Sequence, residues 1–152
     1  MIVVRAYSPE DAAAFLRLYD ACQAHYEAPR ATEDTKALIL DELAAQHGLR
    51  ADIAWADDRP VGFTCSMRVF PAGNGFAIYL KELFVTADAR GTGAGRALMR
   101  NLAERAVAMR ATSLRWESKE IEALKFYARL GAPDNGKTSF TVWAPDLPGF
   151  AA

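Results

Sequence analysis

The residues with the clearest chemical signature lie between Leu83 and Leu98, where a β-rich stretch leads into three alternating glycines and then an apolar helical pattern. Glycine has no Cβ, so a ligand can approach the backbone closely at Gly91, Gly93 and Gly95, and positive φ angles are accessible. Successive backbone N–H groups and the positive end of the helix dipole form a concave anion site. We therefore predict that this segment binds a phosphate group.

Two arginines, Arg90 and Arg96, flank these glycines and could donate charge-assisted hydrogen bonds to a phosphate. The dinucleotide fingerprint is G-x-G-x-x-G in a βαβ unit, whereas the spacing here is G-x-G-x-G and only 57 residues follow Gly95. A P-loop would need Gly-Lys-Ser/Thr, which is absent. The pattern favours a diphosphate bound outside the usual nucleotide folds, and its alternative is a flexible loop before a glycine-softened helix start.

Composition narrows the class of protein. The chain has 152 residues, of which 51% are hydrophobic and 24% charged, with a net charge of −1. A chain of this length predicts a single domain over residues 1–152. The balanced charge excludes the basic footprint of a nucleic-acid-binding protein. The longest stretch without a charge, Val69 to Leu80, is too short to cross a membrane.

The N-terminus lacks the long apolar segment of a signal peptide. Two cysteines, Cys22 and Cys65, and two histidines are too few for a disulfide framework or a zinc site. We therefore expect a soluble, cytoplasmic, metal-free domain with no nucleic-acid or membrane partner.

Periodicity and turn residues predict a mixed α/β sheet with helices on its faces. The expected strands are residues 2–7, 53–56, 61–70, 76–85, 113–117 and 139–143. A capping box at residues 8–11 opens a first helix, Thr32 caps a second that ends near Gly48, a third follows Arg90, and Gly131 terminates a fourth.

The segment 90–95, Arg-Gly-Thr-Gly-Ala-Gly, resembles the Arg/Gln-x-x-Gly-x-Gly/Ala signature of the GCN5-related N-acetyltransferases (GNAT), which cradles the diphosphate of acetyl-CoA. Residues 79–85 are similar to the central strand of that family. Residues 123–132 resemble its A-x-x-F-Y-x-x-x-G segment, and residues 4–12 resemble its usual start. The resemblance implies a single-domain fold with a mixed, mostly antiparallel sheet of about six to seven strands and about four helices. It also implies an acetyl-CoA-dependent N-acetyltransferase acting on a small-molecule amine.

By this resemblance, Tyr127 is expected to protonate the departing thiolate, a transfer that is feasible between a phenol near pKa 10 and a thiol near 8.5. The alternative is a core aromatic on the same helical stripe as Phe126. Glu82 is the expected base. Strand alternation predicts that it shares a face with Ile78, Leu80 and Phe84, apolar company that disfavours its charged form. The alternatives are a structural carboxylate or an edge-strand charge, with water alone deprotonating the amine.

The resemblance also assigns the cofactor contacts. Backbone N–H groups of the central strand would bind the pantetheine arm and polarise the thioester oxygen. One departure stands out, because Glu120 occupies the position where the family usually has Asn. We expect Glu120 to be a solvent-facing charge at a helix start. The expected acetyl-CoA contacts are Leu83, Phe84, Val85, Arg90, Gly91, Thr92, Gly93, Ala94, Gly95, Arg96 and Phe126.

The amine acceptor is expected near Tyr26 and Glu27 at the end of the first helix, and near Trp116 and Glu117 at the end of the fifth strand. Aromatic and acidic groups suit a cationic amine. The alternative is that the aromatics are core or interface residues. The segment around residues 126–132 resembles the diamine and spermidine/spermine branch of the family, while amino acid, aminoglycoside and peptide amines stay open.

Two other classes of function stay open as well. One is a non-catalytic acyl-CoA-binding regulatory module, which is supported by Glu120 in place of the usual Asn, and the other is a nucleotide-binding module. Neither cysteine resembles an acyl-carrying nucleophile, because both lie in apolar patterns. The resemblance therefore implies direct attack in a ternary complex. Residues 138–143 and the tail after them are expected to serve a possible homodimer.

Overall fold

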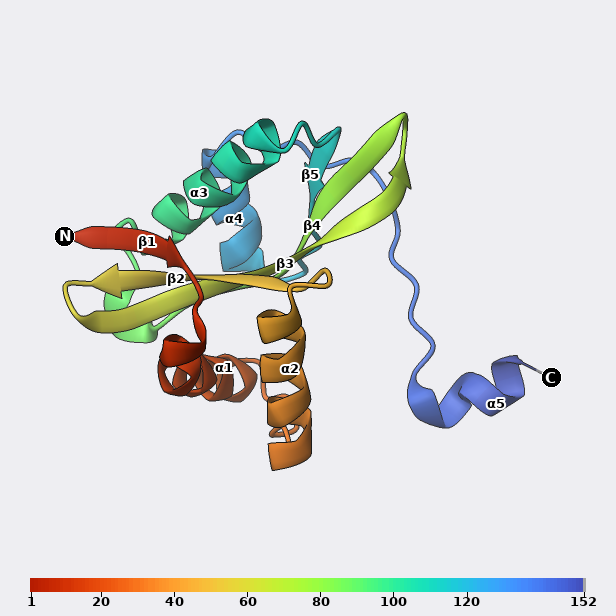
Figure 1. Ribbon diagram of the computed structural model, residues 1–152. Helices are drawn as coiled ribbons and strands as arrows, with labels where there is room; N and C mark the ends of the chain where they lie inside the picture. Colours follow the sequence, from red (N-terminus) through yellow and green to blue (C-terminus); the bar gives the residue numbers. More distant parts are fainter. Residues whose placement is uncertain (152) are drawn as a thin grey trace. The chain divides into compact units, whose positions relative to one another are not determined.

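The computed structural model describes residues 1–151, which form two compact units, Met1–Trp116 and the segment from Glu117 onward. The first unit holds a five-stranded sheet in the order β1-β2-β3-β4-β5 (Figure 1). β1 to β4 are antiparallel neighbours, and β5 runs parallel to β4. The strands are β1 (Ile2–Ala6), β2 (Arg50–Ala56), β3 (Arg59–Ala72), β4 (Gly75–Val85) and β5 (Ser113–Arg115).

Helices cover both faces of this sheet. α1 (Ala12–His25) and α2 (Glu33–Ala45) lie on one face, and α3 (Ala94–Ala108) lies on the other (Figure 1). Under α1, the core gathers Phe15, Phe63 and Phe84. Under α3, it gathers Val61 and Leu98, both of which are fully buried. The predicted mixed α/β fold is confirmed in these layers.

The local signals at the helix starts are confirmed. Ser8 and Asp11 form a capping box around a 3-10 turn, Pro9–Asp11, directly before α1. The hydroxyl oxygen of Thr32 accepts a hydrogen bond from the Thr35 N–H at the start of α2. α2 ends at Ala45, slightly earlier than the predicted end near Gly48, because Gln46 adopts a left-handed conformation.

The second unit contains α4 (Ile121–Arg129), a 3-10 turn (Ala144–Asp146) and the short α5 (Leu147–Phe150). Gly131, with φ +79°, follows the end of α4 as predicted. The strand predicted over residues 139–143 is wrong, since this segment carries no regular structure. A strand needs a hydrogen-bonded neighbour and a buried face, but Phe140 and Trp143 are 90% and 71% exposed.

The described residues therefore form five strands and five α-helices, fewer strands and one helix more than predicted. The fifth strand also stops at Arg115 instead of the predicted 117. No helix among residues 1–151 is long and apolar enough to cross a membrane. The same residues contain no group of three or more His, Cys, Asp or Glu side chains placed to hold a metal ion.

Candidate active site

A β-bulge in β4 sets the direction of Glu82. The register pairs Leu80 with Ser66 and Glu82 with Cys65, so Lys81 is an extra residue in β4. One extra residue reverses the alternation of faces beyond it. Glu82 therefore lies on the opposite face of β4 from Leu80.

This register corrects the expected surroundings of Glu82. It does not share a face with Ile78 and Leu80, but it does share one with Phe84, as predicted. The alternation rule failed because nothing in the residue types of β4 announces the bulge. The Glu82 side chain is 31% exposed, and one of its carboxylate oxygens lies 3.5 Å from the Lys81 ammonium nitrogen.

The face that Glu82 joins is covered by α1. Burial, followed by the negative charge of Glu82, raises the pKa of the Cys22 thiol to about 12. The same two causes, in the same order, raise the pKa of the Tyr19 phenol. Burial and Glu82 likewise raise the pKa of Cys65. The carboxylate thus faces two buried thiols and one phenol on the helix side of the sheet.

The C-terminal half of β4 has an unpaired edge. β5 pairs only with Ala77–Tyr79, so no strand covers residues 80–85 on that side among the described residues. The Thr86 N–H donates to the Val61 carbonyl of β3 at 2.9 Å. Because backbone groups alternate between the two edges of a strand, the N–H groups of Leu83 and Val85 face the open edge. The N–H of Phe84 faces β3 instead.

The predicted anion loop follows this open edge. Gly93 occupies the cap position of α3 with φ +96°, and Gly91 has φ +80°. A Cβ added to either glycine would have no atom within 4 Å, so both face open space. No side chain caps α3, which leaves the first N–H groups of the helix, at Ala94, Gly95 and Arg96, without a partner inside the helix.

Packing beneath the loop holds it in place. Ala89, Ala94 and Leu98 are buried between α3 and the sheet. Gly62 in β3 leaves room for both β4 and α3, because a Cβ there would lie 2.6 Å from the Phe84 carbonyl oxygen and 3.3 Å from the Leu98 side chain. The Thr92 hydroxyl donates to the Ala89 carbonyl at 2.7 Å, which ties the glycines to the preceding 3-10 turn, Ala87–Ala89.

An ion pair fixes the outer side of the same turn. Arg59, at the start of β3, donates to the carboxylate of Asp88. This hydrogen bond is the main cause that lowers the pKa of Asp88, with a second contribution from Thr86. The turn that precedes the glycines is therefore tied to the sheet by the Thr86 N–H and the Asp88 carboxylate, and to the glycines by the Thr92 hydroxyl.

The end of α1 meets the loop and β4. One guanidinium nitrogen of Arg90 lies 3.4 Å from Nδ1 of His25. The Nε–H of Arg90 donates to the Val85 carbonyl at 3.2 Å. The His25 ring also lies 6.0 Å from the Phe84 ring and 4.8 Å from the Tyr26 ring. His25 was not among the predicted site residues, because only the fold brings residues 25, 84 and 90 together.

The remaining acceptor and acid candidates divide between the two units. Tyr26 is 43% exposed, and Glu27 bends the chain after α1 with φ +52°. Trp116, half-buried, ends the first unit. In the second unit, the exposed Glu117 accepts a hydrogen bond from the Ser139 hydroxyl at 3.0 Å.

Tyr127 lies on α4, half-buried, with its ring 5.2 Å from that of Phe126. Glu120 is the residue directly before α4. It is exposed and its carbonyl accepts the Leu124 N–H at 2.9 Å, which confirms the predicted charge at a helix start. The first unit therefore brings together the loop, the open edge of β4, Glu82 and the end of α1, while Tyr127, Phe126 and Glu117 belong to the second unit.

The profile of the acetyltransferase (GNAT) family matches residues 14–132, more than three quarters of the chain. The chain belongs to the GNAT family. The family predicted from residues 90–95 is thereby confirmed, and with it an acetyltransferase fold. The match does not distinguish a polyamine branch.

Solved structures agree with this fold. An integron cassette protein from the mobile metagenome of V. cholerae is 25% identical, with a TM-score of 0.84 over 99% of this chain and 97% of its own. A ribosomal-protein-alanine N-acetyltransferase from Brucella melitensis biovar Abortus 2308 is 20% identical, with a TM-score of 0.74 over 94% and 99%. The aminoglycoside N-acetyltransferase AAC(6')-Iy, bound to a CoA bisubstrate analogue, is 15% identical, with a TM-score of 0.80 over 94% and 98%.

Proposed function

We propose that this protein transfers the acetyl group of acetyl-CoA to the primary amine of a small molecule, by direct attack in a ternary complex. The observation that carries the proposal is the start of α3, where an uncapped helix end and two glycines at positive φ face open space in a chain of the GNAT family. Backbone donors of this kind fit a diphosphate.

The donor side is assigned from the loop outward. Gly91, Gly93 and the first N–H groups of α3 would hold the diphosphate, with Thr92, Arg90 and Arg96 at its margin. The open-edge N–H groups of Leu83 and Val85 would hydrogen-bond the pantetheine arm and the thioester oxygen. Phe126 would supply an apolar contact. Phe84, whose side chain is buried in the core under α1, would support the strand that carries these donors. Acetyl-CoA supplies the activated acetyl group, and the remaining steps fall to the side chains of the protein.

Glu82 and Tyr127 are proposed to move the protons. Glu82 accepts the proton that an ammonium group must lose before its nitrogen can attack. The C–N bond then forms and the C–S bond breaks. The departing thiolate takes the phenol proton of Tyr127, and the second proton on nitrogen passes to solvent. The transfer does not pass through a covalent intermediate on cysteine, because burial raises the pKa of Cys22 and of Cys65 and so disfavours the nucleophilic thiolate.

The acceptor is proposed to lie near the end of α1. Tyr26 and His25 offer aromatic faces, and Glu82 and Glu27 offer carboxylates, a combination that suits a cationic amine. Trp116 and Glu117 are proposed to contribute to the same subsite. Two relatives by fold are called aminoglycoside and ribosomal-protein-alanine acetyltransferases, so these amines join polyamines and amino acids as candidates.

The first test is a calorimetric titration with acetyl-CoA, NAD and ATP in parallel. We expect acetyl-CoA alone to bind with a dissociation constant of about 1 μM, equivalent to about −8 kcal/mol. Preference for NAD or ATP would contradict the proposal. Thiol release should then be measured with spermidine, an aminoglycoside, free alanine and a peptide with an N-terminal alanine.

Conservative variants separate chemistry from binding. Tyr127→Phe and Glu82→Gln should each lower kcat by about 100-fold with acetyl-CoA affinity unchanged, as expected for lost acid or base catalysis. Tyr7→Phe and Glu42→Gln, which remove the same groups elsewhere, serve as controls and should keep wild-type turnover. If the chain binds acetyl-CoA but turns over none of the amines, the regulatory-module alternative is the better description.

The same proposal covers assembly and location. We expect one N-acetyltransferase domain spanning residues 1–152, acting in the cytoplasm, and a homodimer that uses residues 138–143 and the tail. Phe140 and Trp143 are exposed in the single chain, which supports a partner surface there. Light scattering that gives the mass of a monomer would contradict the dimer.

A further inference from the structure

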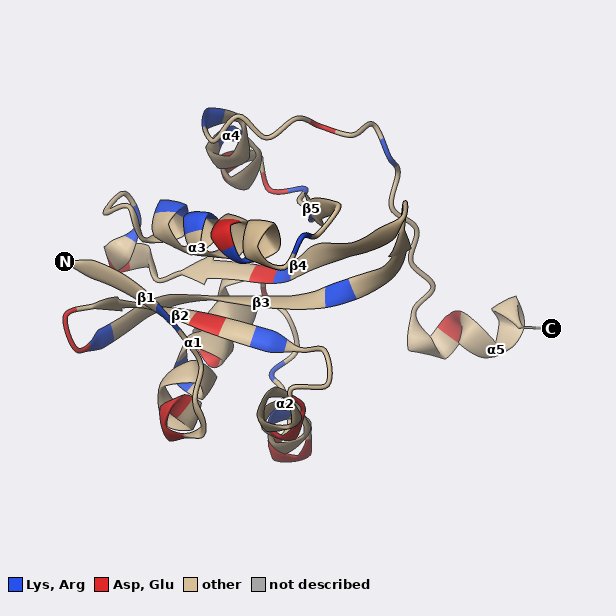
Figure 2. Cartoon of the chain, turned by 45° about the horizontal axis from the view of Figure 1, so that its top comes forward, with Lys and Arg blue, Asp and Glu red and all other residues tan. Residues whose placement is uncertain are grey.

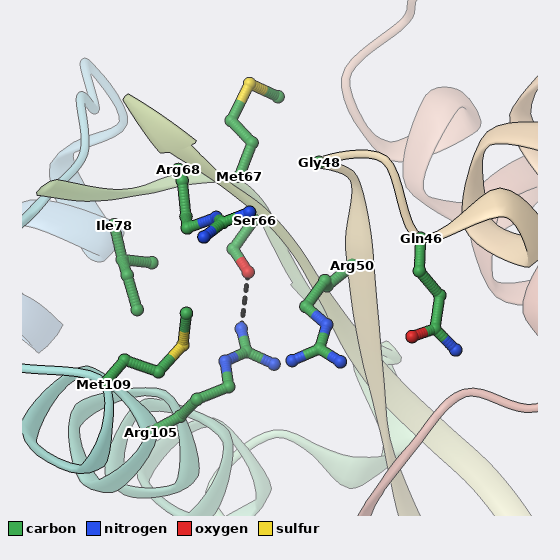
Figure 3. A pocket seen from close by; sticks show the side chains of 9 residues that line it. All are labelled: Gln46, Gly48, Arg50, Ser66, Met67, Arg68, Ile78, Arg105 and Met109. Atoms are coloured by element: carbon green, nitrogen blue, oxygen red, sulfur yellow. Dashed lines mark hydrogen bonds between the residues drawn. The ribbon is translucent and has the colours of Figure 1, made fainter. Parts of the chain in front are cut away.

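A cavity lies at the other end of α3 from the glycine loop. It measures about 250 Å³ and is lined by Arg50 from β2, Arg68 from β3 and Arg105 from the last turn of α3 (Figure 3). An adjoining cavity of about 360 Å³ shares Arg50 and Arg105 with it. Since Arg105 is eleven residues beyond Ala94, the helical rise separates the two regions by about 16 Å along the axis of α3.

One of these arginines is held in place by the protein itself. Nη1 of Arg105 donates to the Asp52 carboxylate at 2.7 Å, and Nη2 donates to the Ser66 hydroxyl at 2.5 Å. Asp52 and Ser66 are 3% and 2% exposed. A hydrogen-bonded, largely desolvated ion pair of this kind fixes the orientation of the guanidinium group. The Arg105 side chain therefore lines the cavity in an orientation that is fixed before any ligand binds.

The other two arginines, Arg50 and Arg68, have no carboxylate partner in the described part of the chain. Within residues 1–151, neither the Arg50 nor the Arg68 side chain makes a hydrogen bond or ion pair. The Arg68 guanidinium carbon lies 5.9 Å from the ring centres of Phe70 and Phe76. Figure 3 shows the guanidinium groups of Arg50 and Arg105 directed toward one another. Like charges that converge in this way repel, and an anion between them would relieve the repulsion.

Positive charge exceeds negative charge around the cavity. Among the described residues that line the two cavities, Asp52 is the only acidic one, and it is already paired with Arg105. Arg5 also lines the second space but is bound by Asp11 through two hydrogen bonds. Figure 2 shows basic residues on β2, β3 and α3, the elements that surround the site. Arg50 and Arg68 therefore leave an excess of two positive charges.

Part of the cavity wall is apolar. Ile78 and Met109 lie beside Arg105 in Figure 3, and both line the smaller cavity. Ile78 is only 2% exposed, so its contact surface is fixed by the sheet. A ligand held here would meet guanidinium groups on one side and aliphatic carbon on the other. The volume lies just below the usual range for small-molecule sites, which begins near about 300 Å³.

We propose that this cavity binds a small organic dianion, either a dicarboxylate or a phosphate monoester, separately from acetyl-CoA. Both kinds of ligand carry two negative charges on a short carbon skeleton. They would match the two uncompensated arginines and the apolar wall, while Arg105 and Ser66 position the anion. The site lies entirely within the first unit.

The test is a calorimetric titration of the full chain, saturated with CoA so that the glycine loop is occupied. Succinate and inorganic phosphate are the two probes, at constant ionic strength. We expect at least one probe to bind saturably with a dissociation constant of about 1 mM or below. Succinate binding alone assigns a dicarboxylate, and phosphate binding alone assigns a phosphate ester.

Variants locate the binding. Arg50→Met and Arg68→Met should each weaken the probe about tenfold, while Arg100→Met should leave it within twofold. Arg100 is the matched control because it is exposed on α3 and lines neither cavity. Thermal unfolding would verify that each variant is folded. Absence of saturable binding by both probes, or an equal loss in Arg100→Met, would overturn the proposal.

This result is separable from the proposed enzyme activity. Should CoA fail to bind, the same titration is run on Gly93→Val, whose glycine loop is blocked. If the probe binds to Gly93→Val and this binding is lost when Arg50→Met is added, the dianion site would be supported even though the acetyltransferase proposal had failed.

Discussion

The two ends of α3 offer positive potential to anions in different ways. At its start, Gly91 and Gly93 expose backbone N–H groups and no cationic side chain is needed for the cradle. In its last turn, Arg105 joins Arg50 and Arg68 from two strands. Backbone donors are fixed by φ and ψ, whereas side-chain cations are fixed by their partners. Ligand affinity at the first region should therefore fall when a glycine gains a side chain, and affinity at the second should fall when an arginine loses its charge.

The largest effect should come from adding a side chain to the loop. Gly93→Val places a branched side chain in the open space at φ +96°, where L-residues are strained. We expect the dissociation constant for acetyl-CoA to rise about 100-fold, or about 2.7 kcal/mol. Calorimetry would measure this change.

Gly136→Val is the matched control, since Gly136 also has positive φ, +68°, and open space around it. It should cost similar stability and leave acetyl-CoA affinity unchanged. Equal affinities in the two variants would remove the loop from the donor site.

A second change tests the support beneath the loop. Gly62→Ala would place a Cβ 2.6 Å from the Phe84 carbonyl oxygen and 3.3 Å from the Leu98 side chain. Relief of this overlap requires backbone movement, so the free energy of unfolding should fall by about 1–3 kcal/mol. Urea unfolding would measure it. Gly73→Ala, in a turn with nothing within 4 Å, is the control for loss of a glycine, and a smaller loss in Gly62→Ala than in this control would contradict the packing argument.

The contrast between the two regions explains what the sequence could predict. The loop is local, so the alternating glycines between Arg90 and Arg96 predicted both its conformation and its family. The arginine cavity draws on β2, β3 and α3, and nothing in the spacing of Arg50, Arg68 and Arg105 announces that they converge.

The same limit applies to Glu82. Its residue type and strand were predicted, yet its face was not, because the extra residue Lys81 in β4 shifts the register. The strand predicted over residues 139–143 failed for another reason. Phe140 and Val142 alternate as in a strand, but the pattern alone cannot supply a neighbouring strand. Among the described residues, this segment has no sheet partner.

A third change would alter the charge of the arginine region. Burial favours a raised pKa for Asp11, but hydrogen bonds from Arg5 and Ser8 and the charge of Arg5 outweigh it, so the pKa lies below its ordinary value of 3.8. A lowered folded-state pKa stabilises the protein above the unfolded-state value of about 4, and this contribution declines as the pH falls from there through the folded-state pKa. Asp11→Asn should therefore cost about 1 kcal/mol at pH 7, because Arg5 is half-exposed, and less at pH 3.

The same variant frees Arg5, which lines the second cavity. We expect the affinity for the dianion probes to rise about threefold as one more cation becomes available. Urea unfolding at pH 7 and pH 3, with a probe titration at pH 7, would check both effects. Asp34→Asn, which removes an exposed charge from the first turn of α2, is the control; a stability loss in Asp11→Asn that is the same at both pH values would contradict the assigned cause.

The smallest effect should come from removing a charge at the loop. Arg96 is exposed in the first turn of α3, so solvent screens its attraction for a diphosphate. The backbone donors remain in Arg96→Met, and acetyl-CoA affinity should fall only about threefold, against the tenfold loss of probe binding expected in Arg50→Met. Calorimetry on both variants gives the ratio. A loss in Arg96→Met as large as in Gly93→Val would mean that side-chain charge, and not the backbone, dominates both ends of α3.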